Sequence, residues 1–217
     1  MADLKIGRMT LGMVQTNCYF VYQKGKPQAL VFDPADRGDY IYQVLKENGF
    51  EVAAILLTHG HFDHILGVTR LKELTGAKVY AYEKEAEICQ EARLNLSGSG
   101  RDACSIIPDI LFKDEEFFEL GGIKGQVIAT PGHTIGSCCY YFEEDKLLIS
   151  GDTLFQESVG RSDFPTGSTS TLIRSICDRL MPLPEDVKVY PGHGDSTTIG
   201  YEKENNPFIL YTERSTE

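Results

Sequence analysis

The stretch THGHFDH, residues 58–64, holds three of the five histidines in a chain of 217 residues. His59 and His61 are two residues apart, so an extended loop can orient both imidazoles to the same side. Asp63 and His64 begin a predicted helix, whose N-terminus favours the carboxylate. Neutral imidazole and carboxylate are the ligands that zinc and similar divalent ions take in proteins. The stretch therefore predicts part of a metal site.

The other two histidines occur in similar positions. His133 lies in TPGHT and His193 lies in YPGHG, each after an apolar run and a Pro-Gly turn. Asp152, in ISGDT, also follows a predicted strand. The segment before THGHFDH, residues 52–57, is continuously apolar, which is typical of a strand buried on both faces. Because α/β proteins build their sites where strands end, we expect these side chains to meet at one rim.

These positions supply more ligands than one structural zinc needs. The candidate ligands are His59, His61, Asp63, His64, His133, Asp152 and His193. A structural zinc site is closed by four ligands, which usually include cysteine. Seven ligands suit two metal ions that share a bridging carboxylate and a bridging water, with the ions roughly 3.5–4 Å apart. Two alternatives are a single catalytic ion with three ligands and a set of polar loop residues that binds no metal.

Strand and helix patterns alternate along the chain. Expected strands are residues 14–22, 28–33, 52–57, 78–82, 117–120, 125–130, 137–142, 146–150 and 187–190. Expected helices are residues 40–48, 65–75, 86–96 and 171–181, with a loop at residues 97–100. Each half of the chain supplies strands and then helices, which indicates two similar layers packed face to face. We therefore expect residues 1–217 to form one α/β domain with the layer order helix, sheet, sheet, helix.

Net charge and hydrophobic patterning exclude some classes of function. The net charge of −11 argues against a nucleic-acid surface, which would need positive charge. We see no apolar run long enough for a membrane span and no basic and apolar leader at the N-terminus. A cytoplasmic protein without nucleic-acid or membrane partners is the expectation. The oligomeric state is left open by the sequence.

The T-H-x-H-x-D-H run, followed in order by His133, Asp152 and His193, resembles the metallo-β-lactamase fold superfamily over nearly the whole chain. The resemblance implies the αββα sandwich and two divalent metal ions, with zinc expected and iron or manganese as alternatives. It implies that the first ion is held by His59, His61 and His133. It implies that the second ion is held by Asp63, His64 and His193, that Asp152 bridges, and that Asp33 is a structural support near the site.

Within the superfamily, the segments TPGHTIGS at residues 130–137, GDTLF at 151–155, GRSDF at 160–164 and NPF at 206–208 resemble the glyoxalase II branch. Glyoxalase II is a hydroxyacylglutathione hydrolase, and the chain is most similar to its short bacterial relatives. The implied reaction is hydrolysis of a small thioester such as S-acyl glutathione by a metal-bridging hydroxide. Asp63 could assist proton transfer. Arg161 is the best candidate for a substrate contact, and an ion pair between Arg161 and Asp163 is the competing interpretation.

One departure from glyoxalase II concerns glutathione. That enzyme carries a helical extension after its last metal histidine, whereas only residues 194–217 follow His193 here. A second enzymatic interpretation is a mono-iron persulfide dioxygenase, which shares the fold and a Gly-Arg-x-Asp-Phe stretch. A third is a metal-binding scaffold without turnover. A nuclease is disfavoured by the acidic charge, and a lactamase by the lack of a secretion signal.

Overall fold

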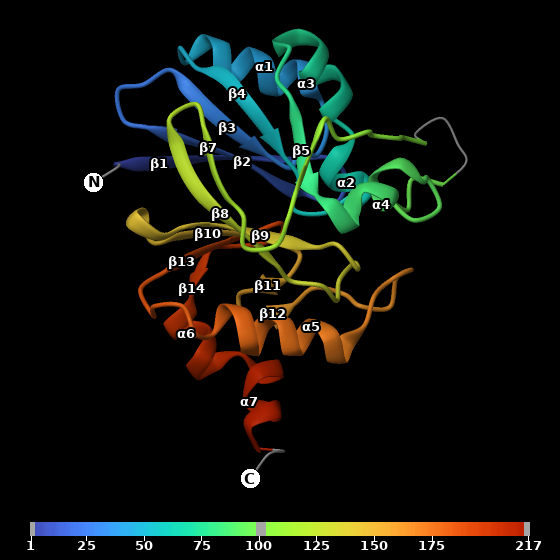
Figure 1. Cartoon of the computed structure of the whole chain (residues 1–217), viewed down its shortest axis with the longest axis vertical. Coiled ribbons are helices and arrows are strands. Elements are labelled where there is room, and N and C mark those ends of the chain that lie inside the picture. Colours follow the sequence, from blue (N-terminus) through green and yellow to red (C-terminus); the bar gives the residue numbers. More distant parts are fainter. Residues whose placement is uncertain (1–2, 99–102, 215–217) are drawn as a thin grey trace.

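Two mixed β-sheets lie face to face, with helices on their outer faces, in the computed structural model, which describes residues 3–98 and 103–214 (Figure 1). The strands of the first sheet, in spatial order, are β1 Leu4–Leu11, β2 Thr16–Gln23, β3 Gln28–Phe32, β4 Glu51–Leu56, β5 Val79–Tyr82 and β6 Ile110–Phe112. The strands of the second sheet, in spatial order, are β14 Thr197–Thr198, β13 Lys188–Pro191, β10 Leu147–Gly151, β9 Cys138–Phe142, β8 Ile123–Ala129 and β7 Phe117–Leu120. A small hairpin joins β11 Leu154–Phe155 to β12 Ser158–Val159.

The outer face of the first sheet is covered by helices from the N-terminal half. They are α1 Gly38–Glu47, α2 Phe62–Ile65, α3 Val68–Thr75, η1 Glu83–Glu85 and α4 Ala86–Gln90. Strands β3 to β6 run parallel, so the carboxyl ends of β4 and β5 point to one edge of the sheet. Ile41, Leu71 and Ile55 belong to one buried cluster, which places α1 and α3 against β4. These parallel strands are apolar because helices and the second sheet bury both of their faces.

The second sheet is covered by helices from the C-terminal half (Figure 1). They are α5 Thr169–Ser175, which continues as the π-helix η3 Ile176–Leu180, then α6 Ile199–Asn205 and α7 Pro207–Arg214; the short helix η2 Glu143–Asp145 joins β9 to β10. Leu172, Ile176 and Ile209 pack with Leu148 of β10 in one buried cluster. Strands β10 and β13 are parallel, and so their carboxyl ends lie at the same edge.

The core between the sheets is rich in aromatic side chains, which pack the two sheets against each other. Phe32 of the first sheet and Tyr140 of the second pack with their ring centroids 5.3 Å apart. The Tyr140 hydroxyl donates a hydrogen bond to the Leu57 carbonyl at 2.8 Å, and the Cys138 N–H donates to the Thr58 carbonyl at 2.9 Å. These bonds connect the end of β4 to β9, so the loop after β4 and the loop before β9 are held at a set separation.

The observed layers confirm the predicted α/β sandwich. Some elements differ from the sequence-based expectation. The predicted helix over residues 86–96 ends at Gln90, because Glu91 turns into extended backbone. The buried Asn95 side chain donates to the Cys104 carbonyl in place of a helical contact. Of the predicted loop, Ser97 and Gly98 are described and residues 99–100 lie outside the described residues.

Strand β1 and helices α6 and α7 were not anticipated from the sequence. Within the described residues, the longest helices fall short of the length and apolar character that a membrane span needs.

Candidate metal centre

The seven candidate ligands converge on one rim of the sandwich. Five elements carry them there: the loop after β4, helix α2, the loop between β8 and β9, and the segments that follow β10 and β13. The side chains fall into three overlapping groups whose potential ligand atoms lie within 4.8 Å of one another. These groups are His59, His61 and His133; His59, His64 and Asp152; and Asp63, His64 and His193. Both halves of the chain therefore contribute to a single cluster.

The first group consists of three buried imidazoles. The Nε2 atom of His133 lies 2.8 Å from Nδ1 of His61 and 3.2 Å from Nε2 of His59. The three rings meet nearly at right angles, with centroids 4.6–4.8 Å apart. Their nitrogen atoms thus face a common point.

Asp152 lies between this group and the second group. Its Oδ2 is 3.7 Å from Nε2 of His133 and 3.5 Å from Nε2 of His193, while its Oδ1 is 3.4 Å from Nε2 of His64. Asp63 Oδ2 completes the second group at 3.3 Å from His193 Nε2 and 3.7 Å from His64 Nε2. One carboxylate is therefore within reach of histidines from both groups.

Outer hydrogen bonds set which nitrogen of each histidine faces the cluster. The Nδ1 of His133 is 2.6 Å from the Arg161 carbonyl, which can only accept, so Nδ1 carries the proton and Nε2 keeps its lone pair. The Nδ1 of His64 likewise donates to Asp33 Oδ2 at 3.0 Å. Thr58 Oγ1 donates to the same carboxylate at 2.7 Å and accepts from Nδ1 of His59 at 3.1 Å. These bonds leave the Nε2 atoms of His59, His64 and His133 facing the cluster.

The surroundings of the first group favour neutral imidazoles. Burial, reinforced by the neighbouring imidazoles, lowers the pKa of His61 to about 3 and holds the pKa of His59 well below its usual value. Burial also lowers the pKa of His133. Metal ligands must be deprotonated, and these environments keep the three rings neutral at physiological pH.

The second group mixes imidazoles with carboxylates. Burial alone would lower the pKa of His193, but Asp152 and Asp63 outweigh it and raise that pKa to about 9. Burial likewise opposes the charged form of His64, yet Asp152, Asp63 and Asp33 hold its pKa well above the usual value. Burial would raise the pKa of Asp63, but His64, His193 and Thr16 bring it to about 2. Protons and metal cations therefore compete for the side chains of this group, and cation binding there should release protons.

The side chains present fit a pair of divalent cations. Among the described residues, the buried polar atoms without a hydrogen-bond partner are His61 Nε2, His64 Nε2 and Asp152 Oδ1. All three belong to the cluster, and such atoms are rare in folded proteins unless an ion or water satisfies them. Space is also reserved there: a Cβ on Gly192 would lie 2.2 Å from Asp152 Oδ1 and 2.6 Å from His64 Cε1.

Arg161 lies beside the cluster and its side chain makes the predicted ion pair. It forms two hydrogen bonds to Asp163, at 3.0 and 2.8 Å, and its guanidinium stacks over the Phe164 ring at 4.1 Å. The Phe164 ring in turn packs edge-on against His61 at 5.4 Å. Arg161 remains 66% exposed, so its charge is available at the mouth of the site.

Several supporting residues were not found from the sequence. Thr16, at the start of β2, donates to Asp63 Oδ2 at 2.9 Å. Glu85, in η1, accepts from the Gly60 N–H at 2.7 Å and from the Thr134 hydroxyl at 2.8 Å. Asp33 was expected only from the family resemblance. It follows β3, a position that a search for polar residues after strands would have marked. Glu85 lies just after β5 and shares that signal, whereas Thr16 does not.

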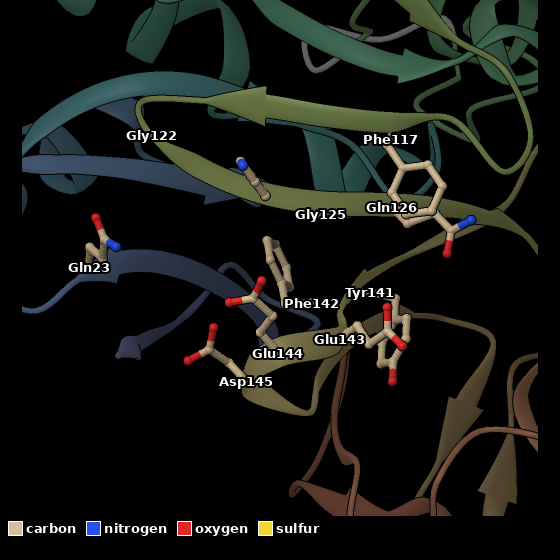
Figure 2. A pocket seen from close by; sticks show the side chains of 11 residues that line it. Gln23, Phe117, Gly122, Gly125, Gln126, Tyr141, Phe142, Glu143, Glu144 and Asp145 are labelled. Carbon is tan, nitrogen blue, oxygen red and sulfur yellow. The ribbon is translucent and has the colours of Figure 1, made fainter. Parts of the chain in front are cut away.

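A separate hollow of about 340 Å³ contains none of the seven candidate ligands (Figure 2). Phe117 of β7 and the turn at Gly122 lie on one side of it, and Glu143, Glu144 and Asp145 lie on the other. This hollow is therefore separate from the histidine rim.

Comparison with known proteins agrees with the geometry. The model of the metallo-beta-lactamase superfamily matches residues 11–193. The probable metallo-hydrolase YqgX of Bacillus subtilis (strain 168) is 38% identical over 208 residues, which are 95% of this chain and 98% of the relative. The hydroxyacylglutathione hydrolase GloC of Haemophilus influenzae (strain ATCC 51907 / DSM 11121 / KW20 / Rd) is 35% identical over 198 residues, covering 90% of this chain and 93% of the relative.

Two solved structures share both sequence and fold. The crystal structure of the BLEG-1 B3 metallo-beta-lactamase has a TM-score of 0.89 and 38% identity, covering 94% of this chain and 99% of that one. The structure of TTHA1623 in a di-iron-bound form has a TM-score of 0.79 and 36% identity, covering 93% and 99%. The domain match, the αββα layers and the ordered histidine and aspartate ligands agree, and the chain belongs to the metallo-β-lactamase superfamily.

Proposed function

We propose that this protein is a metal-dependent hydrolase whose substrates are small thioesters of the S-acyl glutathione type. The observation that carries the proposal is the position of Asp152, within 3.7 Å of histidine nitrogens from both ligand groups. A carboxylate so placed can serve two cations. The similarity to a metallo-hydrolase and to a hydroxyacylglutathione hydrolase supports hydrolysis and the thioester class.

In this proposal the two ligand groups have separate roles. The first cation would be held by His59, His61 and His133, the second would be held by Asp63, His64 and His193, and Asp152 would serve both. When bound, two divalent ions supply an activated water and polarise the carbonyl oxygen of the substrate. Zinc is the expected metal, with iron or manganese as alternatives; the di-iron form of TTHA1623 keeps iron among the metals to be tested.

The chain's own groups fix the geometry of this centre. Asp63 Oδ2 is held by the Thr16 hydroxyl at 2.9 Å and faces His193 Nε2 at 3.3 Å. With a pKa of about 2 in these surroundings, where burial is outweighed by His64, His193 and Thr16, Asp63 is a carboxylate at neutral pH. We expect it to orient a water molecule and to pass on a proton without retaining it.

The mouth of the site suits an anionic thioester. Arg161 and Phe164 lie together beside His61, and the Arg161 charge is exposed to solvent. A carboxylate of the substrate could replace Asp163 as the partner of Arg161, since a planar guanidinium binds carboxylates in a bidentate manner. The leaving thiolate is a weak base, so no side chain needs to act as a strong general acid at that sulfur.

Two other reactions need to be separated from thioester hydrolysis. The 38% identity to BLEG-1 makes β-lactam hydrolysis a second candidate, despite the sequence-based expectation against a lactamase. A mono-iron persulfide dioxygenase is the third, and it requires only one bound ion and oxygen uptake. The convergence of Asp63, His64 and His193 as a second group favours two ions.

The decisive experiment combines metal analysis with a substrate panel. Protein purified without added metal is analysed for zinc, iron and manganese. It is then assayed on S-acyl glutathiones, other thioesters, a β-lactam and a persulfide, with and without chelator. We expect close to two ions per chain and chelator-sensitive thioester hydrolysis.

Asp152→Ala should abolish turnover and lower the metal content, while Asp163→Ala, which removes only the partner of Arg161, should keep both ions. Two ions and full activity in Asp152→Ala would refute the proposal. About one iron per chain with oxygen consumption would favour the dioxygenase instead.

A further inference from the structure

Glu85 is a buried carboxylate that no part of the proposed chemistry uses. It is 1% exposed and lies in η1, directly after β5. Its Oε1 accepts the Gly60 N–H at 2.7 Å, and its Oε2 accepts the Thr134 hydroxyl at 2.8 Å. Gly60 lies between His59 and His61, and Thr134 follows His133. One side chain therefore links the two loops that carry the first ligand group.

The Gly60 N–H and the Thr134 hydroxyl both act as donors to Glu85. The Thr134 N–H donates to Ser137 Oγ at 3.0 Å, so the Ser137 hydroxyl proton can go to Thr134 Oγ1, 2.7 Å away. This arrangement leaves the Thr134 hydroxyl proton for Glu85. A carboxylate accepts at both oxygens, whereas a glutamine would turn an NH₂ group toward one of these donors.

The packing around Glu85 leaves no room for another group to connect the two ligand loops. A Cβ on Gly136 would lie 2.3 Å from the Glu85 nitrogen and 2.5 Å from its Oε2. A Cβ on Gly60 would lie 2.8 Å from the Cys89 nitrogen. Both ligand loops thus approach the η1–α4 segment at backbone distance, and the Glu85 carboxylate fills the position where they meet.

We propose that Glu85 is a positioning residue that holds the His59–His61 loop and the His133 loop at the separation required by the first metal ion. This inference rests on the metal centre of the proposed function and deepens it. The hydrogen bonds of Glu85 end on the loops of the first group, whereas Asp63 and His64 lie on α2 and His193 follows β13. Loss of Glu85 should therefore weaken the binding of the first metal ion and leave the binding of the second unchanged.

The test uses two backgrounds, each of which keeps one ligand group. His193→Ala leaves the first group intact, and His61→Ala leaves the second. Glu85→Gln is added to each, and zinc affinity is measured by competition with a chromophoric chelator. We expect a 10- to 100-fold loss of affinity in the His193→Ala background, the range seen when support of a metal ligand is removed. We expect no change in the His61→Ala background.

Glu202→Gln is the matched control. Glu202 is 0% exposed and accepts from the Glu157 N–H at 2.9 Å and from the Asn206 amide at 2.8 Å, but it lies on α6. The Glu202→Gln substitution should lower the melting temperature of the metal-free protein without changing zinc affinity in the His193→Ala background. If Glu85→Gln does not fold, Thr134→Val in that background should bind zinc more weakly than Thr134→Ser, which keeps the hydroxyl.

Three results would overturn the inference: unchanged zinc affinity of Glu85→Gln in the His193→Ala background, equal losses in both backgrounds, or equal affinities of Thr134→Val and Thr134→Ser. Its failure is separable from that of the proposed function. A wild-type chain that binds no metal contradicts the proposed function, whereas a wild-type chain with two ions and an unaffected Glu85→Gln variant contradicts only the role of Glu85.

Discussion

Gly192→Ala should disable the metal centre although it adds one methyl group. Gly192 is buried, directly before His193. A Cβ there would lie 2.2 Å from Asp152 Oδ1 and 2.6 Å from His64 Cε1, whereas ordinary van der Waals contact begins at 3.4 Å. Asp152 Oδ1 would have to move by the difference between 3.4 and 2.2 Å, about 1.2 Å. A displacement of about 1 Å at reacting or ligating groups can cost 10²-fold in rate.

We expect Gly192→Ala to lose at least one metal ion and at least 100-fold in thioester hydrolysis. The neighbouring Gly194 offers a control of the opposite kind. A Cβ there would meet nothing within 4 Å, but its φ is +76°, so Gly194→Ala should be strained by roughly 1–2 kcal/mol without touching the ligands. Metal content by elemental analysis, hydrolysis rates and the free energy of unfolding are measured for both.

The expected pattern is a metal defect in Gly192→Ala and a stability defect in Gly194→Ala. A Gly192→Ala protein with two ions and wild-type turnover would show that the ligands can move by more than 1 Å without loss of metal or activity. That result would refute the view that the glycine keeps space for Asp152 and His64.

Three further outcomes are expected. Thr58→Val removes the acceptor of the His59 Nδ1 proton, so metal affinity should fall about 10- to 100-fold, whereas Thr58→Ser should bind normally in the same chelator titration. Burial raises the pKa of Glu85 from 4.5 to about 7 against the hydrogen bonds it accepts, so the folded state binds a proton that the unfolded state has lost. Stability of the metal-free protein should therefore fall between pH 4.5 and 7, by on the order of 3 kcal/mol, and chemical denaturation of Glu85→Gln should show a correspondingly flatter profile in that window. Arg161→Ala should raise the KM for anionic thioesters several-fold with little change in kcat or melting temperature, because its guanidinium is exposed and its contacts within the described residues are Asp163 and Phe164 at the mouth; an unchanged KM across charged and neutral thioesters would argue against substrate contact.

Local sequence determined most of the longer strands and the ligand types, although it missed β1 and the short strands β6, β11, β12 and β14. The apolar run at residues 52–57 predicted a strand buried on both faces, and β4 occupies residues 51–56. The Pro-Gly turns before His133 and His193 placed those residues after strands, as observed. Such features are readable because a buried strand and the residues that follow it are consecutive in the chain. The same local signals failed at residues 86–96, where the helix ends at Gln90 and Asn95 bonds to the Cys104 carbonyl in place of a helical contact.

Only the tertiary structure decided which distant groups support the ligands. Thr16 reaches Asp63 across 47 residues of sequence, and Glu85 reaches Thr134 across 49. A threonine at the start of a strand has no pattern that distinguishes it from ordinary polar residues, and the sequence does not separate Glu85 from its neighbours Glu83 and Glu87. Their roles arise because the packing of two sheets brings the ends of β2, β4, β5 and β8 to one rim, where buried donors and acceptors must find partners. The sequence alone therefore determined the chemistry of the ligands, and the fold decided their geometry.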